Sequence, residues 1–152
     1  PNDGRAAHAV SDPFFCETIE AAPEVAAVLG LQPGEKVVHV KRLLRFSGEP
    51  LVFDQIYLVA DLFSGLTLEG LRGGERSLYS LFESDFGVRM IHAEEHLRAV
   101  GADAQSASMI GVPLGEPLLL VERTAYTYGN KPVEWRRGLY STRQHYYRND
   151  LG

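Results

Sequence analysis

The chain has 152 residues, with 15 Lys and Arg against 20 Asp and Glu, a formal net charge of −5, and 45% hydrophobic residues. This length and apolar fraction suit one domain with a core of ordinary size. The acidic balance argues against nucleic-acid binding by this chain alone, because neutralising phosphates requires a basic face. No apolar run approaches membrane-spanning length, the N-terminus lacks a signal-peptide layout, and a single cysteine excludes a disulfide framework. We therefore expect a cytoplasmic location.

The first half of the chain predicts a helix, a hairpin and a second helix. Pro23 in a first turn and Gly30 as a stop signal indicate a short helix. Further on, Ser77 and Gly87 bracket the clearest helix, because apolar residues recur between them at helical spacing. The expected segments are a loose lead-in at 1–14, a helix at 23–29, strands at 36–46 and 51–59, a helical turn at 61–66, a glycine-bearing loop at 71–76 and a helix at 77–87.

The second half predicts three long strands and one short helix. Asp103 is placed to cap that helix, and the tight turn at 128–131 joins the last two strands. The expected segments are a strand at 88–101, a helix at 103–110, strands at 117–128 and 132–140, and a short edge piece at Tyr146 and Tyr147. Hairpins joined by helices, without regular strand–helix alternation, predict an antiparallel α+β domain.

Two neighbouring predicted strands each carry one charge on an otherwise apolar face. Because strand side chains alternate between faces, Arg42 shares its face with the valines and leucines of strand 36–46. Asp54 does the same in strand 51–59, across a turn-rich connection. A lone charge on an inward face is costly unless it is paired or touches a polar ligand. The pattern predicts either a buried ion pair or a charged cavity wall.

Further residues have the chemistry of a polar ligand site. Ser77 stands where free backbone N–H groups at a helix start favour an anion, although N-capping alone would explain it. Glu134 and Tyr140 share one face of a predicted strand. Glu95 is a third isolated charge, on the face of strand 88–101 that also carries Ile91, Ala93, Leu97 and Ala99. Carboxylates, an arginine and hydroxyls such as that of Tyr79 suit a small ligand with an anionic end. An exposed carboxylate, a half-buried ring and a core tyrosine remain the simpler interpretation.

Three other patterns do not predict catalysis or metal binding. The segment from His92 to His96 resembles a zinc-protease motif, but no glutamate follows the first histidine, and strand residues four apart are separated by about 13 Å. Nothing positions a base near Cys16, which we expect to be a packed thiol. The glycine-rich stretch 70–74 lacks the lysine and spacing of a phosphate-binding loop. We expect no catalytic residue, metal or cofactor.

A series of short motifs runs through roughly residues 15–150. They are Leu29-Gly30, Pro33-Gly34-Glu35, Val40 with Arg42, Gly48 with Pro50, Tyr57-Leu58, Ser77-Leu78-Tyr79, Phe86-Gly87, Gly115 with Pro117, Arg123, Tyr126, and Pro132 with Glu134. In this order they resemble the UTRA domain, the effector-binding module of GntR-type bacterial transcription regulators of the HutC subfamily. No single motif is specific, and the resemblance rests on their number and register.

The resemblance implies a chorismate-lyase-like fold, in which helices flank an antiparallel sheet with a ligand cleft. It also implies a homodimer and a separate winged helix-turn-helix domain that binds DNA, with residues 1–14 as the linker from it and 15–152 as the effector-binding domain. The implied effector is a sugar phosphate, an amino sugar or another acidic metabolite. By analogy, its contacts would fall on Arg42, Asp54, Ser77, Tyr79, Glu134 and Tyr140.

One departure from the family pattern concerns the charge of the ligand. The family often has a second arginine two residues after the first, where this chain has Leu44, and Arg45 points to the opposite face. Either another arginine supplies the charge, or the ligand is less anionic than a sugar phosphate, or larger and more apolar. The supplementary candidates are Arg72, Arg76, Glu95 and Arg123, of which Arg123 is expected to serve the fold.

The leading hypothesis is a sensor domain, not an enzyme, whose ligand modulates DNA binding by another domain. Two alternatives remain open. The first is an enzyme resembling chorismate lyase, in which an arginine and carboxylates bind an acid and transfer a proton. The second is a dimerisation module with a vestigial cleft.

Overall fold

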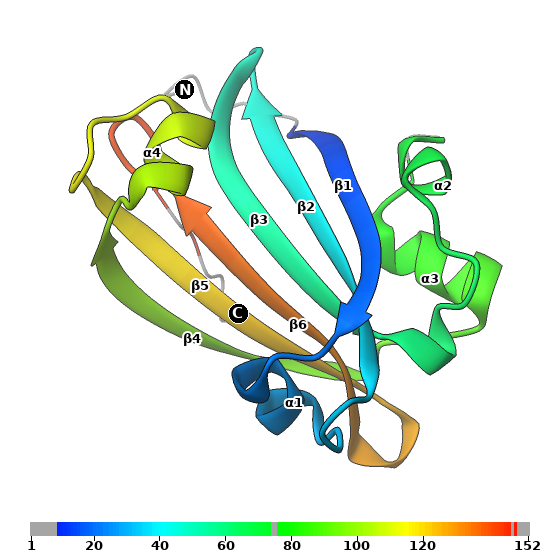
Figure 1. The fold of residues 1–152 in the computed structure, drawn as a ribbon. Helices are drawn as coiled ribbons and strands as arrows, with labels where there is room; N and C mark the ends of the chain where they lie inside the picture. Colours follow the sequence, from blue (N-terminus) through cyan, green and yellow to red (C-terminus); the bar gives the residue numbers. More distant parts are fainter. Residues whose placement is uncertain (1–8, 74–75, 147, 149–152) are drawn as a thin grey trace.

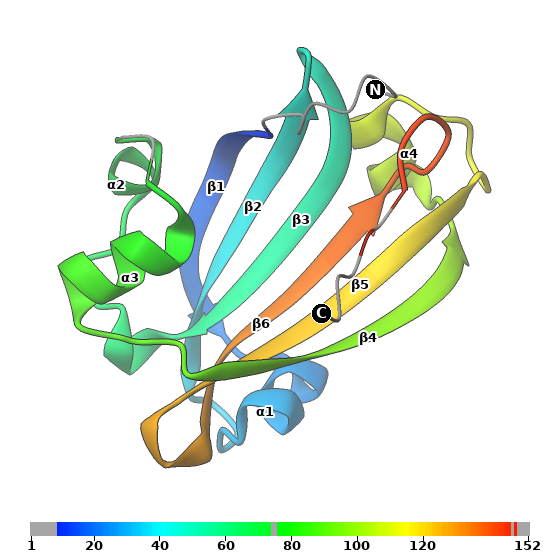
Figure 2. The same cartoon turned by 180° about the vertical axis from the view of Figure 1, so that it is seen from behind.

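The computed structural model describes residues 9–73, 76–146 and 148. Its strands form a six-stranded antiparallel sheet in the order β1-β2-β3-β6-β5-β4 (Figures 1 and 2). The strands are β1 (Val10–Glu20), β2 (Lys36–Phe46), β3 (Glu49–Val59), β4 (His92–Gly101), β5 (Pro117–Thr127) and β6 (Lys131–Tyr140). The helices are α1 (Pro23–Leu29), α2 (Leu68–Arg72), α3 (Leu78–Phe86) and α4 (Ala104–Ile110), with 3-10 turns η1 (Ala60–Leu62) and η2 (Tyr128–Asn130). The predicted α+β class is confirmed.

The β2–β3 hairpin has the predicted position and facing. Ser47 and Gly48 both adopt positive φ angles, 52° and 82°, which is the geometry of a two-residue type I′ turn. Because the turn is this short, β3 begins at Glu49, two residues earlier than expected. The register places Arg42 directly opposite Asp54, so both side chains emerge on one face.

The first strand was not predicted, and part of the expected lead-in belongs to it. Residues 1–8 lie outside the described residues, but β1 starts at Val10 and pairs with β2 along its length. Pro13 obscures this strand in the sequence because proline cannot donate to a ladder hydrogen bond. It is accommodated because β1 is an edge strand and its register shifts between Pro13 and Phe15.

Three other predicted segments differ in detail. The loop expected at 71–76 begins inside α2, whose N-cap Thr67 accepts a hydrogen bond from the Gly70 N–H at 3.0 Å. The helical turn expected at 61–66 is the shorter η1, and β4 begins at His92 rather than at residue 88. Tyr146 lies in no strand, and the other half of the expected edge piece, Tyr147, lies outside the described residues.

The helices α1, α3 and α4 follow their predicted limits. Ser77 caps α3 by accepting from the Ser80 N–H, and Gly87 ends it in the left-handed conformation with φ of 67°. In α4, the Asp103 carboxylate accepts from the Ser106 N–H at 2.8 Å while the Ser106 hydroxyl accepts from the Asp103 N–H at 2.9 Å. Across the described part of the chain, no helix has the length and apolarity to cross a bilayer.

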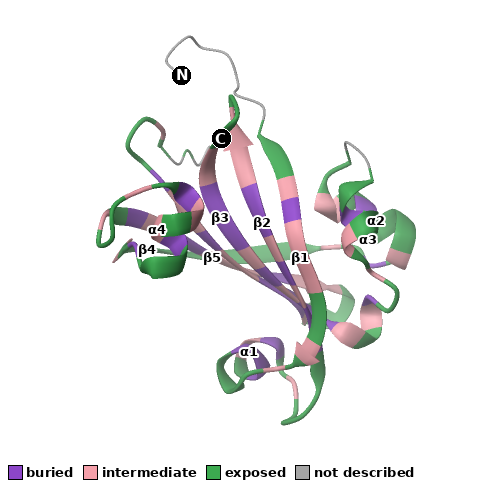
Figure 3. Ribbon diagram, turned by 45° about the horizontal axis from the view of Figure 1, so that its top comes forward, coloured by how far each residue is buried: buried purple, intermediate pink, exposed green. Residues whose placement is uncertain are grey.

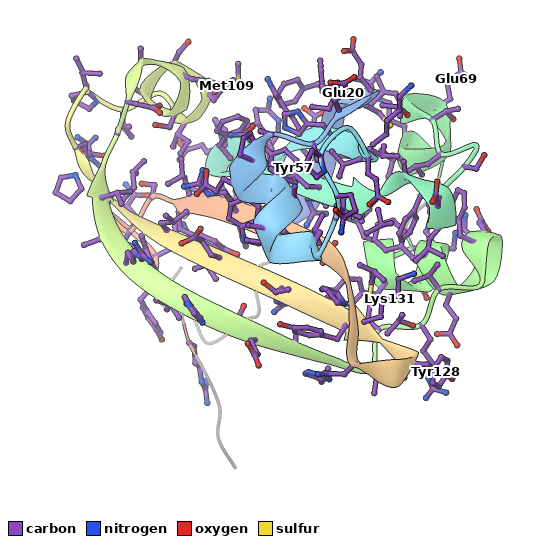
Figure 4. The ribbon with its side chains drawn as sticks, turned by 60° about the horizontal axis from the view of Figure 1, so that its bottom comes forward. Glu20, Tyr57, Glu69, Met109, Tyr128 and Lys131 are labelled. Carbon is purple, nitrogen blue, oxygen red and sulfur yellow. The ribbon has the colours of Figure 1, made fainter. Side chains whose placement is uncertain are left out.

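Different helices cover the two faces of the sheet. The face that carries Arg42 and Asp54, hereafter the cavity face, packs its apolar residues against Leu71 of α2 and Leu81 and Phe82 of α3. The opposite face packs against α1 and α4, and Tyr57 of β3 lies beside α1 (Figure 4). The helices α2 and α3 lie toward the β1 edge and leave the other edge uncovered (Figures 1 and 2).

The edge strand β4 is therefore exposed, although one of its faces is apolar. Leu97, on the apolar face of the strand, is 47% exposed, and nearly every residue of β4 is exposed, in contrast to the buried β3 (Figure 3). The alternation in β4 was predicted correctly, but its apolar face does not join the core.

Candidate functional site

A cavity of about 900 Å³ opens between the start of β1, the cavity face and the α2–α3 segment. Arginines dominate its polar lining, namely Arg42, Arg72, Arg76, Arg123 and Arg136. Ser77 and Tyr79 add hydroxyls, and leucines such as Leu44 and Leu71 form an apolar part of the wall. The arrangement favours a ligand with a negatively charged group.

The pair of Arg42 and Asp54 lies at the base of this cavity. Arg42 Nε donates to Asp54 Oδ2 at 2.9 Å, and the side chains are only 10% and 3% exposed. Burial raises the pKa of Asp54, although Arg136 and Arg42 act in the opposite direction. Arg42 also lines the cavity and donates from Nη1 to the Ser11 hydroxyl at 3.2 Å. Both expectations for the isolated charges, an ion pair and a cavity wall, are met at Arg42.

A second network joins α3 to β5 and β6. The Tyr79 hydroxyl donates to Glu134 Oε1 at 2.8 Å, and Arg136 Nη2 donates to Glu134 Oε2 at 2.9 Å. Arg123 Nη1 donates to the Tyr79 oxygen at 3.4 Å, and its Nη2 lies 3.0 Å from Glu95 Oε2. Burial, followed by the nearby Glu134 carboxylate, raises the pKa of Tyr79, so its hydroxyl stays protonated.

One glycine, Gly138, leaves room for Tyr140 beside the buried Asp54. A Cβ at Gly138 would lie 2.9 Å from Tyr140 Cε1 and 3.1 Å from Asp54 Oδ1. The missing side chain therefore leaves room for the tyrosine ring and the buried carboxylate. Burial, followed by the Asp54 charge, raises the pKa of Tyr140.

The cavity rim carries Ser77 and two arginines from the α2–α3 segment. The Ser77 hydroxyl accepts from the Ser80 N–H at 3.2 Å, as an N-cap does. Arg76 forms a two-pronged contact with Asp85, at 3.0 and 3.2 Å. Arg72 Nε donates to the Pro13 carbonyl at 2.8 Å and, within the described residues, contacts no carboxylate.

The candidate residues divide by their place relative to the cavity. Those on its wall are Arg42, Ser77, Tyr79, Arg72, Arg76 and Arg123. Asp54 and Glu134, buried to 2% and 0% exposure, do not line it, and neither do Tyr140 and the partly exposed Glu95. The carboxylates of Asp54, Glu134 and Glu95 thus contact Arg42, Arg136, Arg123 and Tyr79, which line the cavity. Arg123, expected to serve the fold, both pairs with Glu95 and faces the cavity.

Sequence reasoning missed Arg136, which lines the cavity. The signal was available, because Arg136 lies between Glu134 and Tyr140 with the same strand parity and so points to the same face. Its register partners on that face are Ile56 and Arg123. Burial acts to lower the pKa of Arg136, but Glu134 and Asp54 outweigh it and raise the pKa, so the guanidinium stays charged.

The remaining motifs lie away from the cavity. His92 and His96 lie in β4, the predicted strand, and His92 stacks on Tyr126 at 4.5 Å. The Cys16 thiol is half-buried, contacts the Leu66 carbonyl at 3.8 Å, and packs at the margin of the core. No group of three or more His, Cys, Asp or Glu side chains placed to hold a metal occurs among the residues that the structure describes.

The fold and site thus define an α+β domain with an arginine-lined cavity on one sheet face. Known sequences narrow this class. The UTRA domain matches residues 15–146, and the HTH-type transcriptional regulator Rv0792c of Mycobacterium tuberculosis is 31% identical over 121 residues, covering 78% of this chain and 43% of the regulator. The chain belongs to the UTRA domain family.

Two further comparisons agree with this assignment. The HTH-type transcriptional repressor PhnF of Mycolicibacterium smegmatis is 28% identical over 116 residues, which are 76% of this chain and 46% of PhnF. The ligand-binding domain of a proposed GntR-family transcriptional regulator from Bordetella bronchiseptica superimposes with a TM-score of 0.94 at 45% identity, over 99% of this chain and 93% of that one. The chain spans less than half the length of Rv0792c and PhnF.

Proposed function

We propose that this chain is the ligand-sensing and dimerisation domain of a cytoplasmic, bacterial GntR-type regulator of the HutC subfamily. A small polar, anionic metabolite binds in the cavity and modulates DNA binding by a separate winged helix-turn-helix domain. The observation that carries the proposal is the cavity itself, whose wall presents five guanidinium groups, two of which, those of Arg42 and Arg136, pair with the buried carboxylates of Asp54 and Glu134. Such a wall would be costly to build for stability alone.

The names of relatives support a regulatory role. The M. smegmatis relative is named a transcriptional repressor, and the B. bronchiseptica domain is described as ligand-binding. A ligand changes DNA binding only if it binds one arrangement of the whole regulator better than another. The residues of the cavity come from β1, β2, β5, β6 and the α2–α3 segment, so a bound ligand would connect both ends of the described chain.

The proposed homodimer is supported by the uncovered edge strand. In β4, Leu97 is 47% exposed, and Ile91 just before the strand is 48% exposed. Exposed apolar residues along an unpaired strand edge are a liability that a second copy would cover. Sedimentation of the chain should therefore give a dimer, and Leu97→Lys should shift it toward monomer. A monomeric wild-type chain at high concentration would remove dimerisation from the proposal.

A thermal-shift screen of sugar phosphates, amino sugars and other acidic metabolites tests the sensor function. A true effector at about 100 times its Kd should stabilise the chain by about 2.7 kcal/mol, visible as a raised Tm. Tyr79→Phe removes a cavity hydroxyl and should reduce the response. Tyr128→Phe is the matched control, because Tyr128 is 66% exposed at the β5–β6 connection (Figure 4).

Two experimental outcomes, one in the thermal-shift screen and one in an assay for chorismate turnover, would contradict the sensor function. A failure of every compound to raise the Tm would favour a dimerisation module with a vestigial cleft. Turnover of chorismate by the purified chain, abolished in Arg42→Lys, would favour the enzyme resembling chorismate lyase. The second candidate rests on the same arginine and buried carboxylates, which are also suited to binding an acid.

A further inference from the structure

The proposed effector site has only one arginine from β2. The next position on the same face of that strand, where a second arginine could lie, is apolar. Leu44 lies two residues beyond Arg42 on the same face, opposite Val52, and lines the cavity. Leu71, Leu78 and Leu81 line the same cavity, so this part of the wall is hydrocarbon. A doubly charged group seated there would lose its hydration without gaining hydrogen bonds.

Arg136 brings a second guanidinium to the cavity from another strand. It lies on β6 opposite Ile56 and Arg123, two strands away from Arg42, and its charge acts on that of Arg42. Its Cζ is 5.3 Å from the centre of the Tyr79 ring, and its Nη2 is fixed by Glu134. Its Nε is buried and has no acceptor among the described residues, so one donor of the guanidinium is unpaired while Glu134 and the Tyr79 ring hold the group in place.

The neighbouring Arg137 is the counterpart of Arg136 on the opposite face of the sheet. Arg137 follows on β6, points to the opposite face, and stacks over Trp135 at 5.4 Å. Its Nε also lacks a hydrogen-bond acceptor, but it lies 3.4 Å from the Glu122 carboxylate. In Arg136, the closest contact with Glu134 is made by Nη2, at 2.9 Å.

The charges on the wall are nearly neutralised before any ligand binds. Each of the arginines Arg42, Arg76, Arg123 and Arg136 has a carboxylate partner within 3.1 Å. Of the arginines that line the cavity, only Arg72 contacts no carboxylate among the described residues. Within the described residues, the wall therefore has one uncompensated positive charge, on Arg72, which matches the total charge of a singly charged ligand better than that of a doubly charged one.

Building on the proposed function, we infer that Arg136 replaces the missing β2 arginine as the second guanidinium of the anion subsite. The acid group of the effector then lies between β2 and β6 beneath Tyr79, and its remainder lies along Leu44 and Leu71. The effector is accordingly a singly charged acid with an apolar body, such as a carboxylate, and not a doubly charged phosphate monoester. This assigns a specificity role to Arg136 and to Leu44.

Nuclear magnetic resonance of arginine side chains tests this inference on the 152-residue chain, because weak binding suffices. The probes are hexanoate, a singly charged apolar acid, and glucose 6-phosphate, which is doubly charged above its second pKa of about 6. Hexanoate should shift the Nε–H resonance of Arg136 until it saturates, and should bind more tightly than glucose 6-phosphate. Arg136→Lys keeps the charge but loses the planar fork, so hexanoate should bind about tenfold more weakly.

Two further variants keep the test decisive. Arg137→Lys is the matched control and should leave both affinities unchanged. Leu44→Arg alters a half-buried cavity wall, so it stays informative even if Arg136→Lys fails to fold. By restoring a second β2 arginine it should strengthen glucose 6-phosphate binding by about tenfold and weaken hexanoate binding.

Tighter binding of glucose 6-phosphate by the unaltered chain, or hexanoate binding that is unchanged in Arg136→Lys, would overturn the inference. Either result would leave the sensor function standing, since a ligand would still occupy the cavity. If neither probe produces a saturable shift at any cavity residue, both the inference and the anion-binding part of the proposed function are wrong.

Discussion

Two ion pairs of the sheet have the same chemistry and nearly the same geometry, yet they lie in different surroundings. Arg42 and Asp54 face each other across β2 and β3, and Arg123 and Glu95 face each other across β5 and β4. Their closest contacts are 2.9 and 3.0 Å. The central pair is 10% and 3% exposed, whereas the edge pair is 33% and 22% exposed. Distance alone therefore does not tell which pair the fold depends on, because the difference is in hydration.

Removing one partner from each pair gives the largest expected contrast. Asp54→Ala leaves the buried Arg42 guanidinium without a counter-charge and should lower the free energy of unfolding by about 3–5 kcal/mol. Glu95→Ala leaves a partly hydrated Arg123 and should cost about 1 kcal/mol or less. Urea denaturation of both variants measures the difference. Equal losses would show that burial does not separate the two pairs.

A double variant serves as the control for the central pair. Arg42→Met with Asp54→Leu removes both charges together, so it should recover much of the stability lost in Asp54→Ala. If the double variant is as unstable as the single one, the loss comes from packing and not from an uncompensated charge.

The glycines of the two regions offer a smaller contrast. Gly138→Ala in β6 would put a methyl group 2.9 Å from the Tyr140 ring and should cost about 1–3 kcal/mol as that ring and Asp54 shift. Gly101→Ala in β4 meets its nearest atom, the Gly115 carbonyl oxygen, at 3.4 Å and should cost less. Thermal unfolding of both variants compares them. A larger loss in Gly101→Ala would mean that the edge is the more tightly packed region.

The pH dependence of two carboxyl groups gives the smallest effect, with opposite signs. The Ser106 backbone N–H lowers the pKa of Asp103 below its ordinary 3.8, so the folded state favours the ionised form. Its contribution to stability is present above pH 3.8 and is lost as the pH falls through the lowered pKa. Burial raises the pKa of Asp54, so its contribution is present below pH 3.8 and is lost as the pH rises through the raised pKa.

Urea unfolding between about pH 3 and pH 7 measures these signs. Wild type should exceed Asp103→Asn by about 0.5 kcal/mol at neutral pH, because the charge favours the helix start, and this advantage should vanish in acid. Relative to Asp54→Asn, wild type should instead lose stability as the pH rises. Parallel curves for wild type and Asp54→Asn would mean that the Arg42 charge fully offsets the burial of Asp54.

The contrast between the central strands and the edge strand β4 also explains which structural features can be predicted from the sequence. The face of Arg42 and Asp54 follows from alternation, because the short Ser47-Gly48 turn fixes the register of neighbouring strands. The alternation in β4 is equally clear, but it does not reveal that, among the described residues, α2 and α3 stop short of the face of β4 that carries Leu97. Local sequence patterns therefore predict which face of the sheet a side chain lies on. Whether that side chain is buried depends on the tertiary arrangement of the helices.

The missed elements have local causes. Pro13 hides β1, because a proline is compatible with a strand only at an edge or a bulge, and neither is visible before the sheet is assembled. Gly70 and Gly73 hide α2, whose short length depends on the Thr67 cap. Arg136 was accessible to alternation, but a residue flanked by Glu134 and Arg137 is easily interpreted as part of an ordinary surface charge pattern.

Arg42 fastens three adjacent strands at once. From β2, its guanidinium donates hydrogen bonds to Asp54 on β3 and to the Ser11 hydroxyl on β1. Weaker metabolite binding in an Arg42 variant would therefore have two causes that cannot be separated. The variant loses a ligand contact, and it also loses contacts that hold the strands together. Leu44 makes neither of these contacts and lines the cavity, so it is a better position for separating ligand affinity from stability, whereas Ser77 also caps α3.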